Sequence, residues 1–242
     1  MNTAMSKVLS GAIAQMRRLE VVSENLANVN TVGHKGGHVA FTEVLADVSR
    51  QKERPGGLVA VGEQRTDFSQ GMMQQTENPL DLAIDGDGFF AIETPRGIRY
   101  TRQGSFTRSA DGTVVTPNGD ALLGENGPIR VSGKDVRITA DGHVTSEGAA
   151  VEKIQLARFS DPRTLVKEGH TLFRAPDGTA QLVTTAGDSV NILQGYVEEA
   201  NITPIDALVS LITTQRQFEV YVRAMKTMDA ATEKVLNETA RV

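Results

Sequence analysis

Apolar residues recur at helical spacing at both ends of this 242-residue chain. Near the N-terminus, from Met5 to Val29, they follow a heptad repeat that further apolar residues widen into one face of an amphipathic helix. The repeat comprises Met5, Val8, Ala12, Leu19, Val22, Leu26 and Val29, and the residues that widen it are Leu9, Ile13 and Met16. Asparagines then crowd the chain from Asn25 to Gly33, and because these residue types tolerate left-handed backbone, we expect the helix to end there.

The C-terminal end mirrors this pattern in a segment free of Gly and Pro, from Ile205 to Val242. A second heptad repeat in this segment comprises Leu208, Leu211, Phe218, Val222, Met225 and Leu236. Thr203 can cap the first turn, Pro204 suits the first helical position, and Asp206 favours the positive end of the helix dipole. The sequence therefore predicts one long C-terminal helix.

Polar residues interrupt both repeats, at Gln15 in the first and at Gln215, Asp229 and Thr232 in the second. Polar residues at such positions weaken a free-standing coiled coil but help to fix its register. We therefore expect the two helices to pair with each other or with neighbouring subunits. Periodicity alone equally allows both to be core helices of one globular domain.

Between the two helical ends the pattern changes to a period of two, which is typical of half-buried strands. The clearest predicted strands are Leu80 to Ile84, Phe89 to Glu93, Ile98 to Thr101, Val114 to Thr116, Val136 to Thr139, Val151 to Phe159 and Val190 to Gln194. Turn dipeptides punctuate this region, at Asp111-Gly112, Asn118-Gly119, Asn126-Gly127, Asp141-Gly142 and Asp177-Gly178. The sequence therefore predicts an α+β fold, with long N- and C-terminal α-helices that pair as a coiled-coil-like core domain and a mainly antiparallel β middle domain.

These patterns divide the chain into four segments. We expect residues 1–32 to form the N-terminal helix of the core domain, 33–79 an extended connector, 80–196 a β-rich domain, and 197–242 the C-terminal helix of the core domain. The connector is predicted because its pattern is poor and it contains Pro55-Gly56-Gly57. A connector of this length is unusual inside a compact domain, so it favours a chain that joins a helix to a β domain within an assembly.

The distribution of charge and the residue types exclude several functions. The formal net charge is -5, the pI is near 5.5, and Lys and Arg are scattered, so the basic footprint of a nucleic-acid-binding protein is missing. The absence of cysteine excludes disulfides, thiolate metal sites and Cys nucleophiles. The N-terminal segment lacks the continuous apolar run of a secretory signal, and no later stretch approaches the roughly 20 apolar residues of a membrane span.

Two motifs suggest ligand or metal binding, but the residues around each of them argue against such a site. The run from Gly86 to Ala91 loosely fits a dinucleotide-binding fingerprint, but the chain then continues as an extended segment without the helix that receives a pyrophosphate. His34 and His38 have the spacing of two metal ligands on a helix, yet the glycines around them argue against a helix there. We therefore predict no enzymatic activity and no catalytic, cofactor or metal site.

Three blocks of residues form a longer and more specific pattern. They comprise Asn25, Leu26, Ala27, Asn28, Asn30, Thr31, Gly33 and Lys35; Asp67, Phe68, Ser69, Gln70, Gly71, Asn78, Pro79, Leu80, Asp81, Asp85, Gly86, Asp87, Gly88, Phe89 and Phe90; and the run from Tyr100 to Phe106. This pattern resembles the signature of the bacterial flagellar rod and hook protein family, which usually has an aromatic residue where this chain has His34. A C-terminal run from Gln215 to Glu219 is similar to the same family.

The resemblance implies a structural subunit whose terminal helices line the inner tube of the basal-body rod, where the rod crosses the periplasm, with the β domain outside. The heptad residues of both helices would then form the subunit interface. The implied partners are copies of the chain itself, neighbouring rod proteins and, in transit, the flagellar type III export apparatus, which needs no cleavable signal peptide. No cofactor, nucleic acid, small-molecule substrate or direct membrane insertion is implied. The chain is short where distal rod and hook proteins are longer, so it resembles the proximal rod members most.

Two other classes of function remain open from the sequence. A ligand-binding β domain with helical oligomerisation arms would require convergent polar groups in the middle region, and the sequence offers none. A membrane-surface protein would use the N-terminal helix, whose basic residues are few: Lys7, Arg17 and Arg18.

Overall fold

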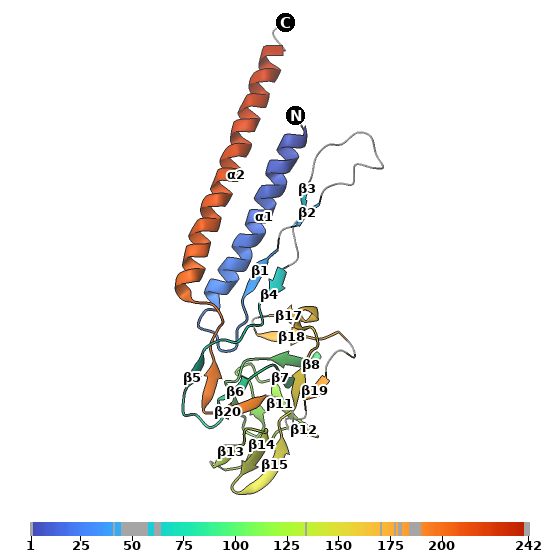
Figure 1. The fold of residues 1–242 in the computed structure, drawn as a ribbon, viewed down its shortest axis with the longest axis vertical. Helices are drawn as coiled ribbons and strands as arrows, with labels where there is room; N and C mark the ends of the chain where they lie inside the picture. Colours follow the sequence, from blue (N-terminus) through green and yellow to red (C-terminus); the bar gives the residue numbers. More distant parts are fainter. Residues whose placement is uncertain are drawn as a thin grey trace. The chain divides into compact units, whose positions relative to one another are not determined.

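A computed structural model of the protein consists of two compact units (Figure 1). The structure describes residues 2–40, 42–44, 58–60, 64–133, 135–169, 171–176, 178, 181–183 and 190–239. The first unit, which we call the helix unit, comprises Met1–Ala27, Gly37–Arg65 and Thr203–Val242. The second, the β unit, comprises Asn28–Gly36 and Thr66–Ile202.

Two long helices dominate the helix unit, where they lie side by side and run antiparallel (Figure 1). They are α1 (Asn2–Ala27) and α2 (Pro204–Thr239), and α1 also contacts β1 (Gly37–Val39), which pairs with β4 (Gln64–Thr66), and β3 (Leu58–Ala60), which pairs with β2 (Thr42–Val44). The predicted cap of α2 is confirmed, because Thr203 Oγ1 accepts a hydrogen bond from the Asp206 amide at 3.2 Å. Neither helix is long and apolar enough, over the residues described, to cross a membrane.

The β unit is built from short antiparallel strands around β7 (Phe89–Thr94). The others are β5 (Met73–Gln75), β6 (Leu82–Asp85), β8 (Gly97–Thr101), β9 (Thr107–Arg108), β10 (Val114–Val115), β11 (Ala121–Gly124), β12 (Gly127–Pro128), β13 (Val136–Ile138), β14 (His143–Ser146), β15 (Ala149–Lys153), β16 (Leu156–Arg158), β17 (Val166–Glu168), β18 (Leu172–Arg174), β19 (Gln181–Val183), β20 (Asn191–Gln194) and β21 (Tyr196–Glu198), with a 3-10 turn at Pro162–Thr164. The main sheet follows the order β17-β18-β8-β7-β11-β10-β9, and β16 joins β7 to β19. Together with the helix pair, this sheet confirms the predicted α+β fold.

The strand prediction was wrong in one respect, because Val151 to Phe159 is not one strand. β15 pairs with β14 in a separate sheet, whereas β16 pairs with β7 in the main sheet. The chain changes sheets at Ile154, which makes an isolated bridge to Gly124. Of the predicted turns, Asn118-Gly119 and Asp141-Gly142 have the expected left-handed glycines, both at φ 88°, whereas Asp177 lies outside the described residues.

The segment 33–79, which the sequence predicts as a connector, is divided between the two units and contains β1 to β5. Its Pro55-Gly56-Gly57 turn lies outside the described residues. β1 and β3 contact α1, so part of the segment packs within the helix unit.

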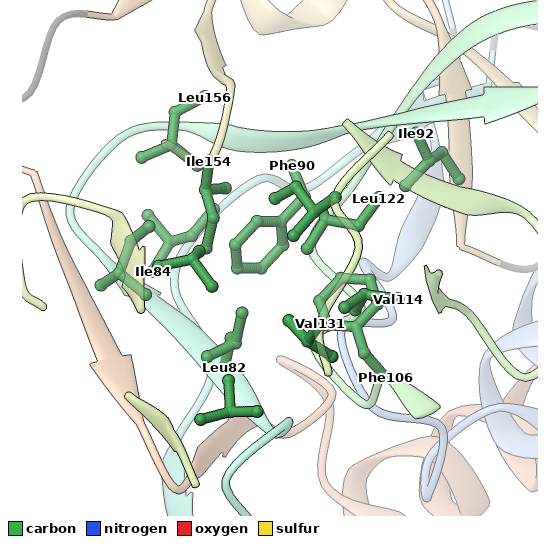
Figure 2. Packing of buried hydrophobic residues seen from close by; sticks show 14 of the residues in the cluster. Leu82, Ile84, Phe90, Ile92, Phe106, Val114, Leu122, Val131, Ile154 and Leu156 are labelled. Carbon is green, nitrogen blue, oxygen red and sulfur yellow. The ribbon is translucent and has the colours of Figure 1, made fainter. Parts of the chain in front are cut away.

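Two apolar clusters fill the β unit, and β7 contributes to both. Phe90 is fully buried in the larger cluster, where its ring meets that of Phe106 edge to face at 5.4 Å (Figure 2). Its neighbour Phe89 points into the smaller cluster, where its ring lies 5.6 Å from Phe159 and 5.9 Å from Phe173. Because successive side chains of a strand alternate between faces, a run of apolar residues in β7 requires a core on both sides of the sheet.

Candidate assembly site

One face of α2 packs towards α1. Its buried and half-buried residues are spaced alternately by four and three positions: Ala207, Leu211, Thr214, Phe218, Tyr221, Met225, Met228 and Thr232. This spacing is the heptad repeat of a two-helix contact. We call this face the α2 seam.

Small residues of α1 let the two helices approach closely. A Cβ atom added at Gly11 would lie 2.4 Å from Cε1 of Tyr221, so no larger residue fits there unless the ring moves. Ala14 is also buried in α1. Two buried polar atoms of the helix pair, Gln15 Oε1 and Thr214 Oγ1, have no hydrogen-bond partner among the described residues, and such atoms cost stability. The helices therefore approach each other closely, but the contact between them buries few large apolar side chains.

Each helix also carries an apolar stripe that nothing in the described chain covers. The α1 stripe consists of Met5, Leu9, Ile13 and Met16, which are 39 to 50% exposed, and the α2 stripe of Ile205, Leu208, Val209 and Ile212, which are 47 to 73% exposed. Since each helical residue turns about 100° from the last, the α2 stripe lies opposite the α2 seam, and the α1 stripe points away from Gly11. A helix that is apolar on opposite faces is typical of one that is buried in an assembly.

The heptad residues predicted from the sequence are divided between these surfaces. In α2, Leu211, Phe218 and Met225 belong to the α2 seam, Val222 is half-buried beside it, and Leu208 lies in the α2 stripe. In α1, Met5 lies in the α1 stripe, Ala12 and Val22 are buried, and Val8, Leu19 and Leu26 are half-buried. The side chain of Leu236 lies outside the described residues. Sequence reasoning missed the small residues of the contact, such as Gly11, Ala14 and Ala207. A search for large apolar residues at heptad spacing does not find them.

A buried charge cluster lies in the β unit, where the three family-like blocks converge. Lys35 Nζ donates to Glu198 Oε1 at 2.5 Å, and Arg102 Nη1 donates to Glu198 Oε2 at 3.2 Å. Lys35 and Glu198 are at most 1% exposed, and Arg102 is 5% exposed. The Gly71 amide also donates to Glu198 Oε1, at 2.8 Å. One carboxylate therefore faces two cations in a site that is almost completely shielded from solvent.

Backbone oxygens and an aromatic ring stabilise the second cation of this cluster. Arg102 Nη1 donates to the Ile84 carbonyl at 3.2 Å and Nη2 to the Gly86 carbonyl at 2.7 Å, and its guanidinium lies 5.3 Å from the centre of the Phe89 ring. Lys35 Nζ likewise donates to the Ser69 carbonyl at 2.6 Å. Burial lowers the pKa of Lys35 and of Arg102, and Glu198 opposes that shift in both groups.

Asn201 ties the same blocks together through backbone groups. Its Oδ1 accepts from the Gly36 amide at 2.8 Å, and its Nδ2 donates to the Asp67 carbonyl at 2.8 Å. The Gly33 amide donates to the Glu198 carbonyl at 2.7 Å. The segments 28–36, 66–71 and 198–202 are thus joined to one another inside the β unit. Each of them continues directly into the helix unit along the chain.

Two members of the N-terminal block have roles that their residue types explain. Gly33 has φ 69°, and a Cβ there would lie 2.3 Å from the Arg102 carbonyl carbon, so only glycine fits. In the helix unit, the Asn25 side chain makes a paired contact with the Gly37 backbone: Nδ2 donates to the carbonyl at 2.7 Å and Oδ1 accepts from the amide at 2.9 Å. The end of α1 is thereby joined to β1.

The remaining residues of the three blocks form turns and core around the cluster. In the first block, Asn28 is buried, Leu26 and Thr31 are half-buried, and Ala27 and Asn30 are exposed. In the second block, Phe68 packs on Phe89, Gln70 donates a hydrogen bond to the Ile84 carbonyl, and the residues from Asn78 to Asp81 form a turn. Asp85 and Asp87 are exposed, whereas Gly88 and Phe90 are buried. Sequence reasoning found Lys35 but missed Glu198 and Asn201. In the sequence, Glu198 and Asn201 are simply polar residues shortly before the predicted C-terminal helix, and no local pattern distinguishes them from solvent-exposed residues.

The terminal groups of the charge cluster are committed to one another and to backbone oxygens, and Arg102 Nε is the one buried side-chain atom of the cluster without a hydrogen-bond partner among the described residues. A hollow of about 420 Å³ lies beside Arg102, lined also by Phe68, Phe89 and Arg158, but both terminal nitrogens of Arg102 are committed to protein oxygens. No group of three or more His, Asp or Glu residues that could hold a metal ion exists within the described part of the chain. The cluster is therefore a structural element.

Comparison with known proteins agrees with the three blocks. Residues 1–35 match the model "Flagella basal body rod protein", residues 83–146 the "Flagellar hook protein FlgE/F/G D1 domain", and residues 193–238 the "Flagellar basal body rod FlgEFG protein C-terminal". The chain is 31% identical to the flagellar basal-body rod protein FlgF of Mesorhizobium japonicum, over 98% of this chain and 97% of that protein. The chain belongs to the flagellar basal-body rod protein family.

Other members of the family are about equally similar. FlgG of Agrobacterium fabrum is 32% identical, over 93% of this chain and 95% of that protein, and FlgF of Caulobacter vibrioides is 33% identical, over 93% of each. Membership makes this chain a structural, non-enzymatic protein of the flagellar basal-body rod, and rod proteins assemble with other rod subunits. The exposed stripes of α1 and α2 are therefore candidate contacts between subunits.

Proposed function

We propose that this chain is a subunit of the proximal part of the flagellar rod, where it assembles with copies of itself and with neighbouring rod proteins into an axle that transmits torque. The observation that carries this proposal is the pair of exposed apolar stripes on helices whose opposite faces already pack together. Full burial of such a side chain from complete exposure gains roughly 1.5 to 3 kcal/mol, and because most of these residues are about half exposed, partner subunits would gain roughly half of that for each one they cover.

A rod must resist twisting, which requires many helix contacts in parallel and no soft joint. The charge cluster supports this role. It fastens to one another the parts of the β unit that continue into the helix unit, so load that enters along any of these segments is shared among the others.

Chain length supports the proximal over the distal rod position. The alignment with FlgG of A. fabrum runs over 250 positions yet covers 93% of this 242-residue chain, so that protein has residues that this chain lacks. The alignment with FlgF of M. japonicum runs over 239 positions and covers 98% of the chain, so few residues are missing. The distal rod protein is the alternative.

Export would follow from the same assignment. We propose that the chain leaves the cytoplasm as an unfolded polypeptide through the flagellar type III apparatus, without a cleavable signal peptide, and folds its helical ends on the growing rod. The weak contact between α1 and α2 suits this route, because contacts with neighbouring subunits would then make folding of the helices favourable at the growing rod.

The function is tested in cells that lack the native gene. Ile212→Asp places a charge in the α2 stripe, whereas Thr213→Asp places one on the next exposed residue, outside the stripe. We expect the first variant to abolish motility and to be absent from purified basal bodies, and the second to restore both. Electron microscopy of the basal bodies would then show density for the subunit at the membrane-proximal end of the rod. Motile cells with Ile212→Asp would contradict the proposal.

A further inference from the structure

The two apolar stripes lie at different heights along the helix pair. Gly11 packs against Tyr221, which fixes how the antiparallel helices align. The α1 stripe is centred near Gly11, whereas the α2 stripe is centred near Leu208 and Val209, twelve or thirteen residues before Tyr221. At 1.5 Å per residue, the stripes are offset by about 19 Å along the axis. They also face outwards on opposite sides of the pair.

This arrangement decides which kind of contact between copies covers the stripes. A two-fold symmetric contact would place like on like, α1 stripe on α1 stripe or α2 stripe on α2 stripe, and each such dimer would leave the other stripe of both copies in water. A contact between the α1 stripe of one copy and the α2 stripe of the next covers both kinds. Because the stripes lie on opposite sides, that contact repeats without closing on two copies, as heterologous contacts do.

The size of each stripe also favours a repeating contact over an isolated dimer. Four aliphatic side chains that are each about half exposed supply roughly half of the ~800 Å² that each partner buries in a stable interface. One contact is therefore weak. A copy inside a row uses both stripes at once and is held on two sides.

Charged residues follow each stripe on its C-terminal side. On the outward face of α2, the apolar residues stop after Ile212 and are followed by Arg216, Glu219 and Arg223, although Val220 stays exposed. On α1, exposed Glu20 follows the stripe. Because the two helices run antiparallel, sliding the α2 stripe towards the C-terminal end of α1 would bring Arg216 against the α1 stripe and Glu20 against the α2 stripe, which limits the contact in that direction.

From these observations, which rest on the proposed self-assembly, we infer that the α1 stripe of one subunit packs against the α2 stripe of a second copy shifted by about 19 Å along the helix axis. Repetition of this heterologous contact generates a staggered row of helix pairs. The size of the shift follows from the positions of the two stripes within a single chain, so the sequence of the subunit determines the spacing between copies along the row.

Engineered disulfides test both the pairing and the shift, because the chain has no cysteine of its own. At the inferred shift, Leu9 of one copy lies within about 2 Å of the height of Val209 of the next. Within one chain these residues are about 21 Å apart along the axis, far beyond the reach of a disulfide. We expect the double variant Leu9→Cys/Val209→Cys to give, under mild oxidation at assembling concentrations, a ladder of covalent dimers, trimers and larger species. A mixture of the two single variants should give only the heterodimer.

The control keeps the same face of α2 but changes the height. Arg223 is exposed, lies two heptads beyond Val209 on the outward face and is about 21 Å further along the axis. Leu9→Cys/Arg223→Cys should remain at least tenfold less cross-linked than the Val209 pair, with circular dichroism showing intact helices in both.

Three results would overturn the inference. Homodimers from Leu9→Cys alone would indicate a two-fold contact, and equal ladders from the Arg223 and Val209 pairs would indicate no fixed shift. Large assemblies in sedimentation that never cross-link through Val209 would leave self-assembly standing and reject this pairing. A wild-type chain that stays monomeric at every concentration would reject both the pairing and self-assembly.

Discussion

Glu198 joins the two buried cations of the charge cluster, because its carboxylate accepts hydrogen bonds from both of them. Removing one partner of a buried ion pair leaves an uncompensated charge, which costs far more than a solvent-exposed pair gains. The cluster holds more positive than negative charge. The carboxylate is therefore harder to replace than either cation.

Glu198→Gln should destabilise the β unit by about 3–5 kcal/mol, because Lys35 and Arg102 remain buried without a counter-charge. Lys35→Met should cost less, since the remaining pair is neutral. Urea denaturation followed by near-ultraviolet absorption of the tyrosines measures the loss. Glu199→Gln, one residue further on, is the control and should change stability by less than about 0.5 kcal/mol. Equal midpoints for the Glu198 and Glu199 variants would refute the role of the cluster.

Glu168 gives the β unit a dependence on acid. A hydrogen bond from Arg99, at 2.8 Å, is the largest influence that lowers the pKa of Glu168. A carboxyl group whose pKa is lowered by folding stabilises the folded state above its ordinary pKa, and this contribution is lost as pH falls through the folded value. The urea concentration at the midpoint of wild-type unfolding should therefore decrease as the pH is lowered below about 4.3.

Comparison with Glu168→Gln isolates this contribution, because Asp111 and Asp141 also have lowered pKa values, from hydrogen bonds with Thr113 and Thr139. Urea midpoints measured between pH 7 and pH 3 should differ between wild type and Glu168→Gln at neutral pH. The two curves should converge in acid. A constant gap across the range would exclude the proposed titration.

At the scale of single elements, sequence patterns identified both helices and the strands with the clearest alternation, such as β6, β7 and β20, because their signals are local. Many of the two- and three-residue strands, such as β9, β12 and β18, were not predicted, because so short a segment carries no periodicity of its own. The α2 seam was harder to place. The predicted repeat ran through Leu208, Gln215 and Asp229, whereas the structure shifts these positions to Ala207, Thr214 and Met228 and leaves Gln215 and Asp229 exposed. Large apolar residues lie on two faces of α2, so hydrophobicity alone does not distinguish the face that packs within the chain.

The charge cluster could not be predicted for a different reason. Lys35 and Glu198 are 163 residues apart in sequence, and neither lies in a pattern that indicates burial. A lysine in an irregular segment and a glutamate at the end of a short strand are ordinarily solvent-exposed. Resemblance to the family marked Lys35 as a residue of interest, but only the fold reveals the partner that makes its burial possible.

Gly11→Ala tests how closely α1 and α2 pack. In an isolated helix this change is stabilising by about 1 kcal/mol, whereas here the new methyl group meets the ring of Tyr221. We expect a net loss of about 1 kcal/mol or more in the thermal unfolding of the helices, followed by circular dichroism at 222 nm. Tyr221→Ala should reverse the sign of the Gly11→Ala effect in a double-mutant cycle. Stabilisation by Gly11→Ala in the wild-type background would contradict close packing.

The two units of the molecule differ in the size of their buried side chains. The buried apolar residues described in the helix unit are small, namely Ala12, Ala14, Val21, Val22 and Ala207. The β unit buries whole phenylalanine, leucine and isoleucine side chains, such as Phe90 and Ile154. Since stabilisation grows with the apolar area that folding buries, the helix unit should be the less stable part of a monomer.

Hydrogen exchange measured by mass spectrometry distinguishes the two units directly. In the monomer, peptides from residues 5–26 and 205–239 should exchange much faster than peptides covering β7 and β8, because opening the helix pair exposes little apolar surface. Assembly should slow exchange in the helices by at least tenfold and leave β7 unchanged, since the new contacts form on the α1 and α2 stripes. Ile212→Asp provides the control, because it should exchange like the monomer at every concentration. If the monomer protects its helices as strongly as β7, then folding of the ends does not depend on neighbours, and the coupling between folding and assembly must be abandoned.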